Sequence, residues 1–120
     1  MDEPTHLRIA ASTVNGVAVI TLAGELDLAS APALADAIAG AASSGAELVI
    51  VDLRDVEFMD SSGIGVLVKA HQAATQSGRR FAVVKGSPQV DRILRLTGLH
   101  ELMTLLDAPE ELLQGSGADL

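Results

Sequence analysis

Apolar and polar residues alternate along the first part of the chain in two short runs. Leu7–Thr13 and Val17–Ala23 are rich in apolar and β-branched residues, and the Asn15-Gly16 pair between them is a strong signal for a tight hairpin turn. We therefore expect two antiparallel strands, with Gly24 ending the second strand.

Helical spacing then alternates with short runs that contain no polar residue. Ser30 and Pro32 mark the start of a first helix, and Ser43-Ser44-Gly45 ends it. The run Leu48–Val51 is entirely apolar, which is typical of a central strand that is covered on both faces.

The second half of the chain repeats this alternation. A second helix is predicted from Ser61 to Ser77, before Gly78, because apolar residues recur at spacings of three and four. Phe81–Val84 is predicted to be another buried strand. Further on we expect a helix that Ser87-Pro88 opens and Gly98 ends, with Val90, Ile93, Leu94 and Thr97 inward, a short edge strand at Met103–Leu106, and a last helical turn at Pro109–Leu113.

The predicted order ββαβαβαβα indicates a single α/β domain. Alternating strands and helices favour a mixed, mostly parallel sheet with helices packed on it, here with an antiparallel hairpin at its N-terminal end. We place the domain at residues 7–113 and expect residues 1–6 and 114–120 to be flexible termini. A chain of 120 residues is long enough for one such core.

The amino-acid composition excludes several classes of function but says little more about the fold. The formal net charge of −8 argues against nucleic-acid binding, which depends on attraction to phosphates. The chain has no cysteine, no secretory signal and no apolar run long enough to enter a bilayer, so we expect a cytoplasmic protein without membrane insertion. Between Glu25 and Asp60 the chain has eight acids and a single base, Arg54: the acids are Glu25, Asp27, Asp36, Glu47, Asp52, Asp55, Glu57 and Asp60. They are interpreted either as a docking surface or as a solvated face.

The segment Asp60–Gly65 places two hydroxyls directly behind a carboxylate, where helical spacing begins. A serine there can cap the helix, and a phosphate on it would meet the positive end of the helix dipole. Phosphorylation would add about −1.5 to −2 charges beside Asp60. An N-cap with no further role is the competing interpretation for Ser61.

Enzymatic interpretations find little support. The segment Gly63–Val68 lacks the third glycine of a dinucleotide fingerprint, and there is no phosphate-binding loop. The motif of a serine hydrolase, Gly-x-Ser-x-Gly, is also missing. His6 and His100 have no His, Asp or Glu nearby at metal spacing, and His71 falls on the apolar face of its helix, where a buried or half-buried histidine is expected more often than a ligand. We expect no enzyme activity, no metal and no cofactor.

Three motifs together carry a resemblance to a known family. They are Leu22–Asp27, Val56–Gly65, and Ser87–Leu94 running into Thr97-Gly98-Leu99. In this order and spacing, over roughly residues 7 to 113, the chain resembles the anti-sigma factor antagonists of the STAS domain family.

The resemblance implies a partner switch. In that family the unphosphorylated antagonist binds an anti-sigma factor that is also a serine kinase of the histidine-kinase-like ATPase fold, and thereby frees a sigma factor. Phosphorylation weakens the complex, and a serine phosphatase restores the antagonist. The resemblance implies that Ser61 is the acceptor, with Ser62 as a second candidate, and that the partner-binding residues are Glu25, Asp27, Asp60, Ser62, Gly63, Ile64 and Val66.

Two alternatives remain open. A STAS module could serve a stress-signalling assembly or the cytosolic side of a transporter, without acting on a sigma factor. The other alternative is a small serine hydrolase. The sequence does not identify the kinase, the sigma factor, the stimulus or the oligomeric state.

Overall fold

The computed structural model describes residues 6–112. Its first two strands, β1 (Leu7–Val14) and β2 (Val17–Leu26), form the expected antiparallel hairpin. Asn15 and Gly16 have φ angles of 52° and 80°, the left-handed conformation that a tight turn of this kind requires. The Asn-Gly prediction is therefore confirmed.

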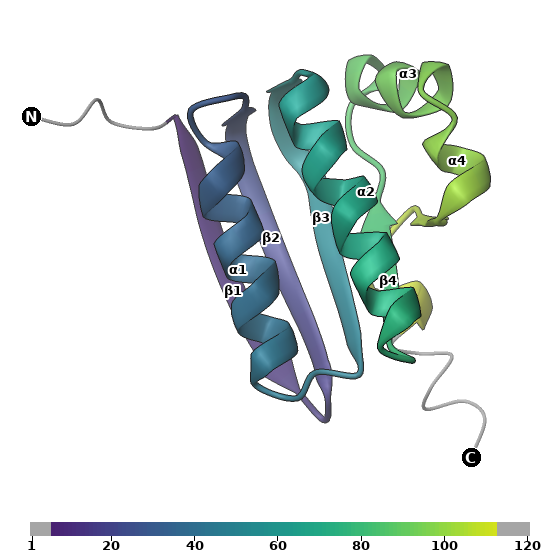
Figure 1. Ribbon diagram of the computed structural model, residues 1–120. Helices are drawn as coiled ribbons and strands as arrows, with labels where there is room; N and C mark the ends of the chain where they lie inside the picture. Colours follow the sequence, from purple (N-terminus) through teal and green to yellow (C-terminus); the bar gives the residue numbers. More distant parts are fainter. Residues whose placement is uncertain (1–5, 113–120) are drawn as a thin grey trace, which may run out of the picture.

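All strands belong to one sheet, in the order β1-β2-β3-β4-β5 (Figure 1). The strands β3 (Leu48–Met59), β4 (Arg80–Val84) and β5 (Thr104–Leu106) run parallel to β2. The prediction of a mixed, mostly parallel sheet with an N-terminal hairpin is confirmed.

The two long helices cover the same face of this sheet. In Figure 1, α1 (Ala31–Ser43) lies over β1 and β2, and α2 (Ser61–Gln76) lies over β3 and β4. The shorter α3 (Pro88–Leu96) starts at a Ser87 cap, whose side chain accepts a hydrogen bond from Val90 N at 3.3 Å.

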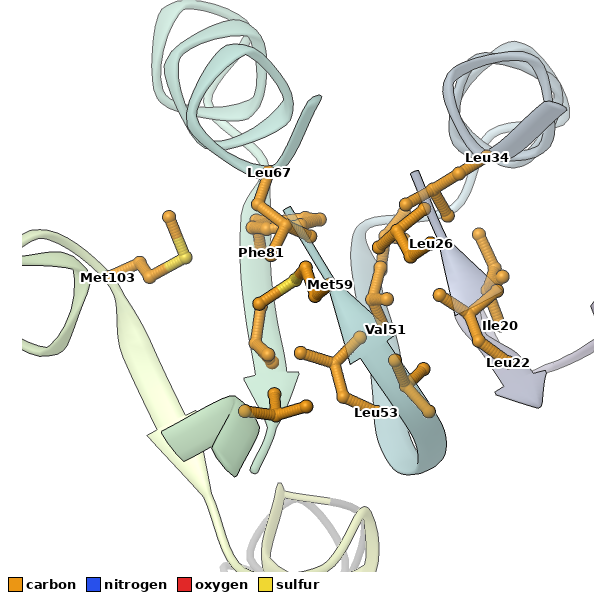
Figure 2. Packing of buried hydrophobic residues seen from close by; sticks show 14 of the residues in the cluster. Ile20, Leu22, Leu26, Leu34, Val51, Leu53, Met59, Leu67, Phe81 and Met103 are labelled. Atoms are coloured by element: carbon orange, nitrogen blue, oxygen red, sulfur yellow. The ribbon is translucent and has the colours of Figure 1, made fainter. Parts of the chain in front are cut away.

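Buried residues on this face form the main core (Figure 2). Leu34 of α1 and Leu67 of α2 point toward the sheet and are fully buried. The opposite face carries a smaller cluster, made of Leu48, Ile50, Ala82, Val84 and Leu106, with Leu112 packed against it. The entirely apolar run at the start of β3 is thus covered on both faces, as its sequence predicted.

Several boundaries differ from the sequence predictions. The strand β2 continues past Gly24, which has a φ of 109° at an irregularity in the pairing with β3. The strand β3 continues to Met59 because its polar second half still pairs with β2 up to Leu26. Thr97 is exposed rather than inward, and its hydroxyl donates to the carbonyl of Ile93 at 2.7 Å.

The C-terminal third contains a helix that the sequence did not predict. This short helix, α4 (Leu99–Leu102), follows Gly98, whose φ of 78° ends α3 and redirects the chain. The last helical turn begins at residue 110, and its predicted end at Leu113 lies outside the described residues. The predicted flexible termini also lie outside them, except His6, whose carbonyl accepts a hydrogen bond from Glu25 N at 2.9 Å.

Candidate functional site

The carboxyl ends of β2 and β3 bring the two acidic motifs together. Leu26 and Met59 are paired in register, and Asp60 N donates to the carbonyl of Leu26 at 3.2 Å. The loop that begins at Asp27 and the first turn of α2 are therefore neighbours, although they are far apart in the sequence.

Asp60, not Ser61, caps α2. Its backbone is extended, with φ −114° and ψ −171°, and its carboxylate Oδ1 accepts a hydrogen bond from Ser62 N at 2.8 Å. The interpretation of Ser61 as the N-cap is wrong, because the extended backbone of β3 lasts one residue longer and puts Ser61 at the first helical position.

Ser61 is left as an accessible hydroxyl. The residue is exposed, and within residues 6–112 its side chain forms no hydrogen bond. Ser62 is half-buried, and its backbone N–H is occupied by Asp60. Of the two serines, Ser61 is thus the more exposed residue, and neither side chain caps the helix.

The Asp27 side chain carries a charge and also makes hydrogen bonds that hold its own loop. Its Oδ1 accepts a hydrogen bond from Ser30 N at 3.1 Å and lies 3.1 Å from the Ser30 hydroxyl oxygen. Ser30 is fully buried, and its hydroxyl oxygen in turn accepts from Asp27 N at 2.9 Å. This reciprocal pairing fixes the loop between β2 and α1 beside Ser61.

Gly63 seats the first turn of α2 on the strand ends. A Cβ at this position would lie 2.7 Å from Leu26 Cγ and 2.9 Å from Met59 Cγ, closer than real side chains approach. Gly63 is buried, so its direct part in the site is to let the helix start close to the sheet.

The remaining predicted contact residues differ in their surroundings. Glu25 is exposed at the end of β2. Ile64 and Val66 are half-buried and pack against the core, and Val66 also lines a cavity between α1 and α2. Of the three, Glu25 offers the largest free surface to a partner.

The eight acids counted in the sequence do not form one patch. Asp52 is buried, and its carboxylate forms an ion pair of 2.8 Å with Arg54, which raises the pKa of the Arg54 guanidinium. Glu47 follows α1 at the opposite end of β3 from Asp60, and its backbone N–H donates to Gly16 in the hairpin turn. The acidic surface near Ser61 therefore contains fewer residues than the sequence suggested.

Sequence reasoning missed two exposed apolar residues near the site. Leu28 is 77% exposed in the loop after Asp27, and Phe58 is 51% exposed at the end of β3. Phe58 pairs in register with Glu25. The signal was present in Phe58-Met59, because neighbours in a strand face opposite ways and Met59 is in the core.

The described residues bear on metal ligation and on membrane spanning. No group of three His, Cys, Asp or Glu side chains could hold a metal ion there. In the same part of the chain, no helix is long and apolar enough to cross a membrane.

The family model of the STAS domain matches residues 8–112, nearly all of the chain. The chain belongs to the STAS domain family. Among curated relatives, the anti-sigma-F factor antagonist RsfB of Mycobacterium tuberculosis is 31% identical over 96% of this chain and 93% of its own. The resemblance drawn from the three motifs is thus confirmed.

Solved structures of STAS proteins agree with this. An anti-sigma factor antagonist from Mycobacterium paratuberculosis superposes with a TM-score of 0.84 at 28% identity, covering 96% of this chain and 97% of the other. The Bacillus protein SpoIIAA matches in its unphosphorylated form, with a TM-score of 0.78, 26% identity and coverage of 92% and 97%. Its phosphorylated form has a TM-score of 0.71 at 25% identity, with coverage of 91% and 99%.

A transporter protein shares the fold as well. A sulfate transporter family protein from Wolinella succinogenes has a TM-score of 0.70 at 17% identity over 89% of both chains. At this identity the likeness extends to the STAS fold alone.

Proposed function

We propose that this STAS domain is a non-enzymatic anti-sigma factor antagonist switched by phosphorylation of Ser61. Unphosphorylated, it binds an anti-sigma factor that is also a serine kinase and so frees a sigma factor. The kinase uses ATP to phosphorylate Ser61, and a serine phosphatase reverses the modification. The single observation that carries this proposal is the exposed, unbonded Ser61 hydroxyl at the first position of α2, directly after the capping Asp60.

The local geometry is compatible with a folded phosphorylated form. A phosphate on Ser61 would project from an exposed residue at the positive end of the α2 dipole, which offsets part of its repulsion from Asp60. The capping bond from Ser62 N to Asp60 does not involve the Ser61 side chain. Within residues 6–112, the Ser61 side chain therefore makes no hydrogen bond that phosphorylation would break. The likeness of this chain to both forms of SpoIIAA supports the same view.

The surface around Ser61 also suits protein docking. Leu28 is an exposed apolar side chain that lines the same cavity as Ser61, and Phe58 is exposed at the end of β3, where it pairs in register with Glu25. Aromatic side chains in this setting act as anchors at interfaces, because their burial removes a large apolar area from water. A dianion placed among them would have to lose water opposite groups arranged for a neutral hydroxyl.

Ser61 is expected to be the principal phosphoacceptor. After incubation with the cognate kinase and ATP, phosphopeptide mapping should find the phosphate on Ser61, because this hydroxyl is exposed while Ser62 is half-buried. Ser61→Ala should abolish labelling, whereas the matched variant Ser62→Ala should keep it. Labelling that persists in Ser61→Ala and disappears in Ser62→Ala would overturn the assignment.

Replacing Asp27 by Asn should separate its charge from its structural contact. The amide oxygen of Asn can still accept from Ser30 N, so the free energy of unfolding should change by less than about 1 kcal/mol. Association with the kinase should be slower for the variant than for wild type. The difference in rate should shrink as salt rises, because salt screens the Asp27 charge of the wild type. An association rate equal to wild type at low salt would show that Asp27 serves only the loop. Asp27→Ala, which removes the acceptor, is the variant expected to lose stability.

A further inference from the structure

A cavity lies between α1 and α2. Its volume is about 640 Å³, within the range of about 300–1,000 Å³ typical of small-molecule sites. Its floor includes Val49 of β3 and Phe81 of β4. Its walls are mostly apolar and come from the two helices, with Ala35, Ile38, Ala39 and Ala42 on one side and Val66, Ala70, Ala73 and Ala74 on the other.

The charges of the lining are opposite to those of the chain. Lys69, Arg79 and Arg80 line the cavity, and no Asp or Glu does, although the chain has a net charge of −8. None of the three forms an ion pair within residues 6–112. Arg79 donates a hydrogen bond to the carbonyl of Ala42 at the end of α1, which holds its guanidinium at the cavity. Glu47 accepts a backbone hydrogen bond from Arg80 N but does not line the cavity.

The two arginines of the lining lie at the opposite end of the cavity from Ser61 and Ser62. Arg79 and Arg80 follow the C-terminal end of α2, whereas Ser61 and Ser62 line the cavity at the N-terminal end of the same helix. Between these ends the lining is apolar except for Lys69. An occupant that matches this arrangement has an extended apolar body and one anionic end.

We propose that this cavity binds a free single-chain aliphatic carboxylate. Its chain lies between α1 and α2, where apolar side chains remove it from water, and its carboxylate meets the guanidinium group of Arg79, which the bond to the carbonyl of Ala42 holds at the cavity. A chain long enough to cross the cavity ends beside Ser61, the proposed phosphoacceptor. The site itself stands independently of the proposed partner switch, because it rests only on the cavity and its charges.

Binding is tested directly with dodecanoate, added below its micelle concentration to the full chain and followed by calorimetry and by amide chemical shifts. Saturable 1:1 binding is expected, with shifts concentrated on the residues that line the cavity. Affinity should rise about fourfold for each added methylene from octanoate to dodecanoate, as burial of a CH₂ group predicts.

Two matched pairs of variants locate the site. Ala73→Leu fills the cavity and should weaken dodecanoate binding at least about tenfold, whereas Gln72→Leu, on the same helix but outside the lining, should not. Arg79→Gln should weaken dodecanoate about tenfold and leave dodecanol unchanged, as expected for loss of a charge-assisted hydrogen bond. Arg92→Gln, an exposed base on α3, should change neither. Ala39→Leu, from the facing helix, is the second filling variant should Ala73→Leu fail to fold.

Several results would overturn the proposal. They are the absence of saturable binding, equal binding by the filling variants and Gln72→Leu, equal affinity for dodecanol and dodecanoate, and binding to anionic phospholipid vesicles without binding of monomeric dodecanoate. None of these results depends on a kinase or on Ser61, so the proposal can fail while the partner switch stands.

Discussion

Phosphorylation of Ser61 is expected to lower the affinity for the anti-sigma factor by about 100-fold or more. The modification adds about −1.5 to −2 charges at an exposed position that directly follows Asp60 and lines the same cavity as Leu28. At a docked interface that charge must lose its water, and an unpaired buried charge costs roughly 3–5 kcal/mol. Since about 1.4 kcal/mol corresponds to a factor of ten, even the lower figure exceeds 100-fold. Calorimetric titration of the two forms against the kinase measures the difference.

The loss should arise at the interface and not from a change of fold. Amide chemical shifts of the phosphorylated protein should differ mainly at 24–27 and 60–65, because these segments adjoin Ser61 through the pairing of Leu26 with Met59. Shifts that spread across β4, at Arg80–Val84, would indicate an internal rearrangement instead. The melting temperatures of the two forms should agree within a few degrees.

Gly63→Ala and Gly65→Ala are expected to change stability in opposite directions. A Cβ on Gly63 would lie 2.7 Å from Leu26 Cγ, and Leu26 is fully buried, so overpacking should cost about 1–3 kcal/mol. A Cβ on Gly65 would meet nothing within 4 Å, so Gly65→Ala should stabilise the helix by about 0.5–1 kcal/mol. Urea denaturation of both variants measures the difference.

The pair is matched because both glycines lie within the same two turns of α2. If Gly63→Ala proved as stable as Gly65→Ala, then close seating of the helix on Leu26 and Met59 would not explain why the motif needs a glycine there. Gly63→Ala should also weaken kinase binding, since lifting the first turn moves Ser61 relative to the Asp27 loop.

Local signals predicted the parts of the fold that depend on local chemistry. The Asn15-Gly16 turn was predictable because both positions require a positive φ that few residue types adopt. The central strand was predictable because Leu48–Val51 has no polar residue. The far half of β3 was not, since Asp52 and Arg54 look like loop residues until their ion pair is seen.

The sequence named candidate site residues but not their structural roles. Both Asp60 and Ser61 are good capping residues, and the choice between them depends on where the pairing of β2 with β3 ends. Sequence identified Asp27 as a charge, but its contact with buried Ser30 appears only in three dimensions. The cavity between α1 and α2 was likewise not predictable, because it depends on how far apart the two helices lie.

Release of a sigma factor tests the proposed function most directly. A preformed complex of the anti-sigma factor with its sigma factor is mixed with unphosphorylated protein, Ser61-phosphorylated protein or Ser61→Ala, and free sigma factor is measured. The account predicts release by the unphosphorylated protein and by Ser61→Ala, and little or none by the phosphorylated form. Equal release by the phosphorylated and unphosphorylated forms, or no release by any of them, would contradict it.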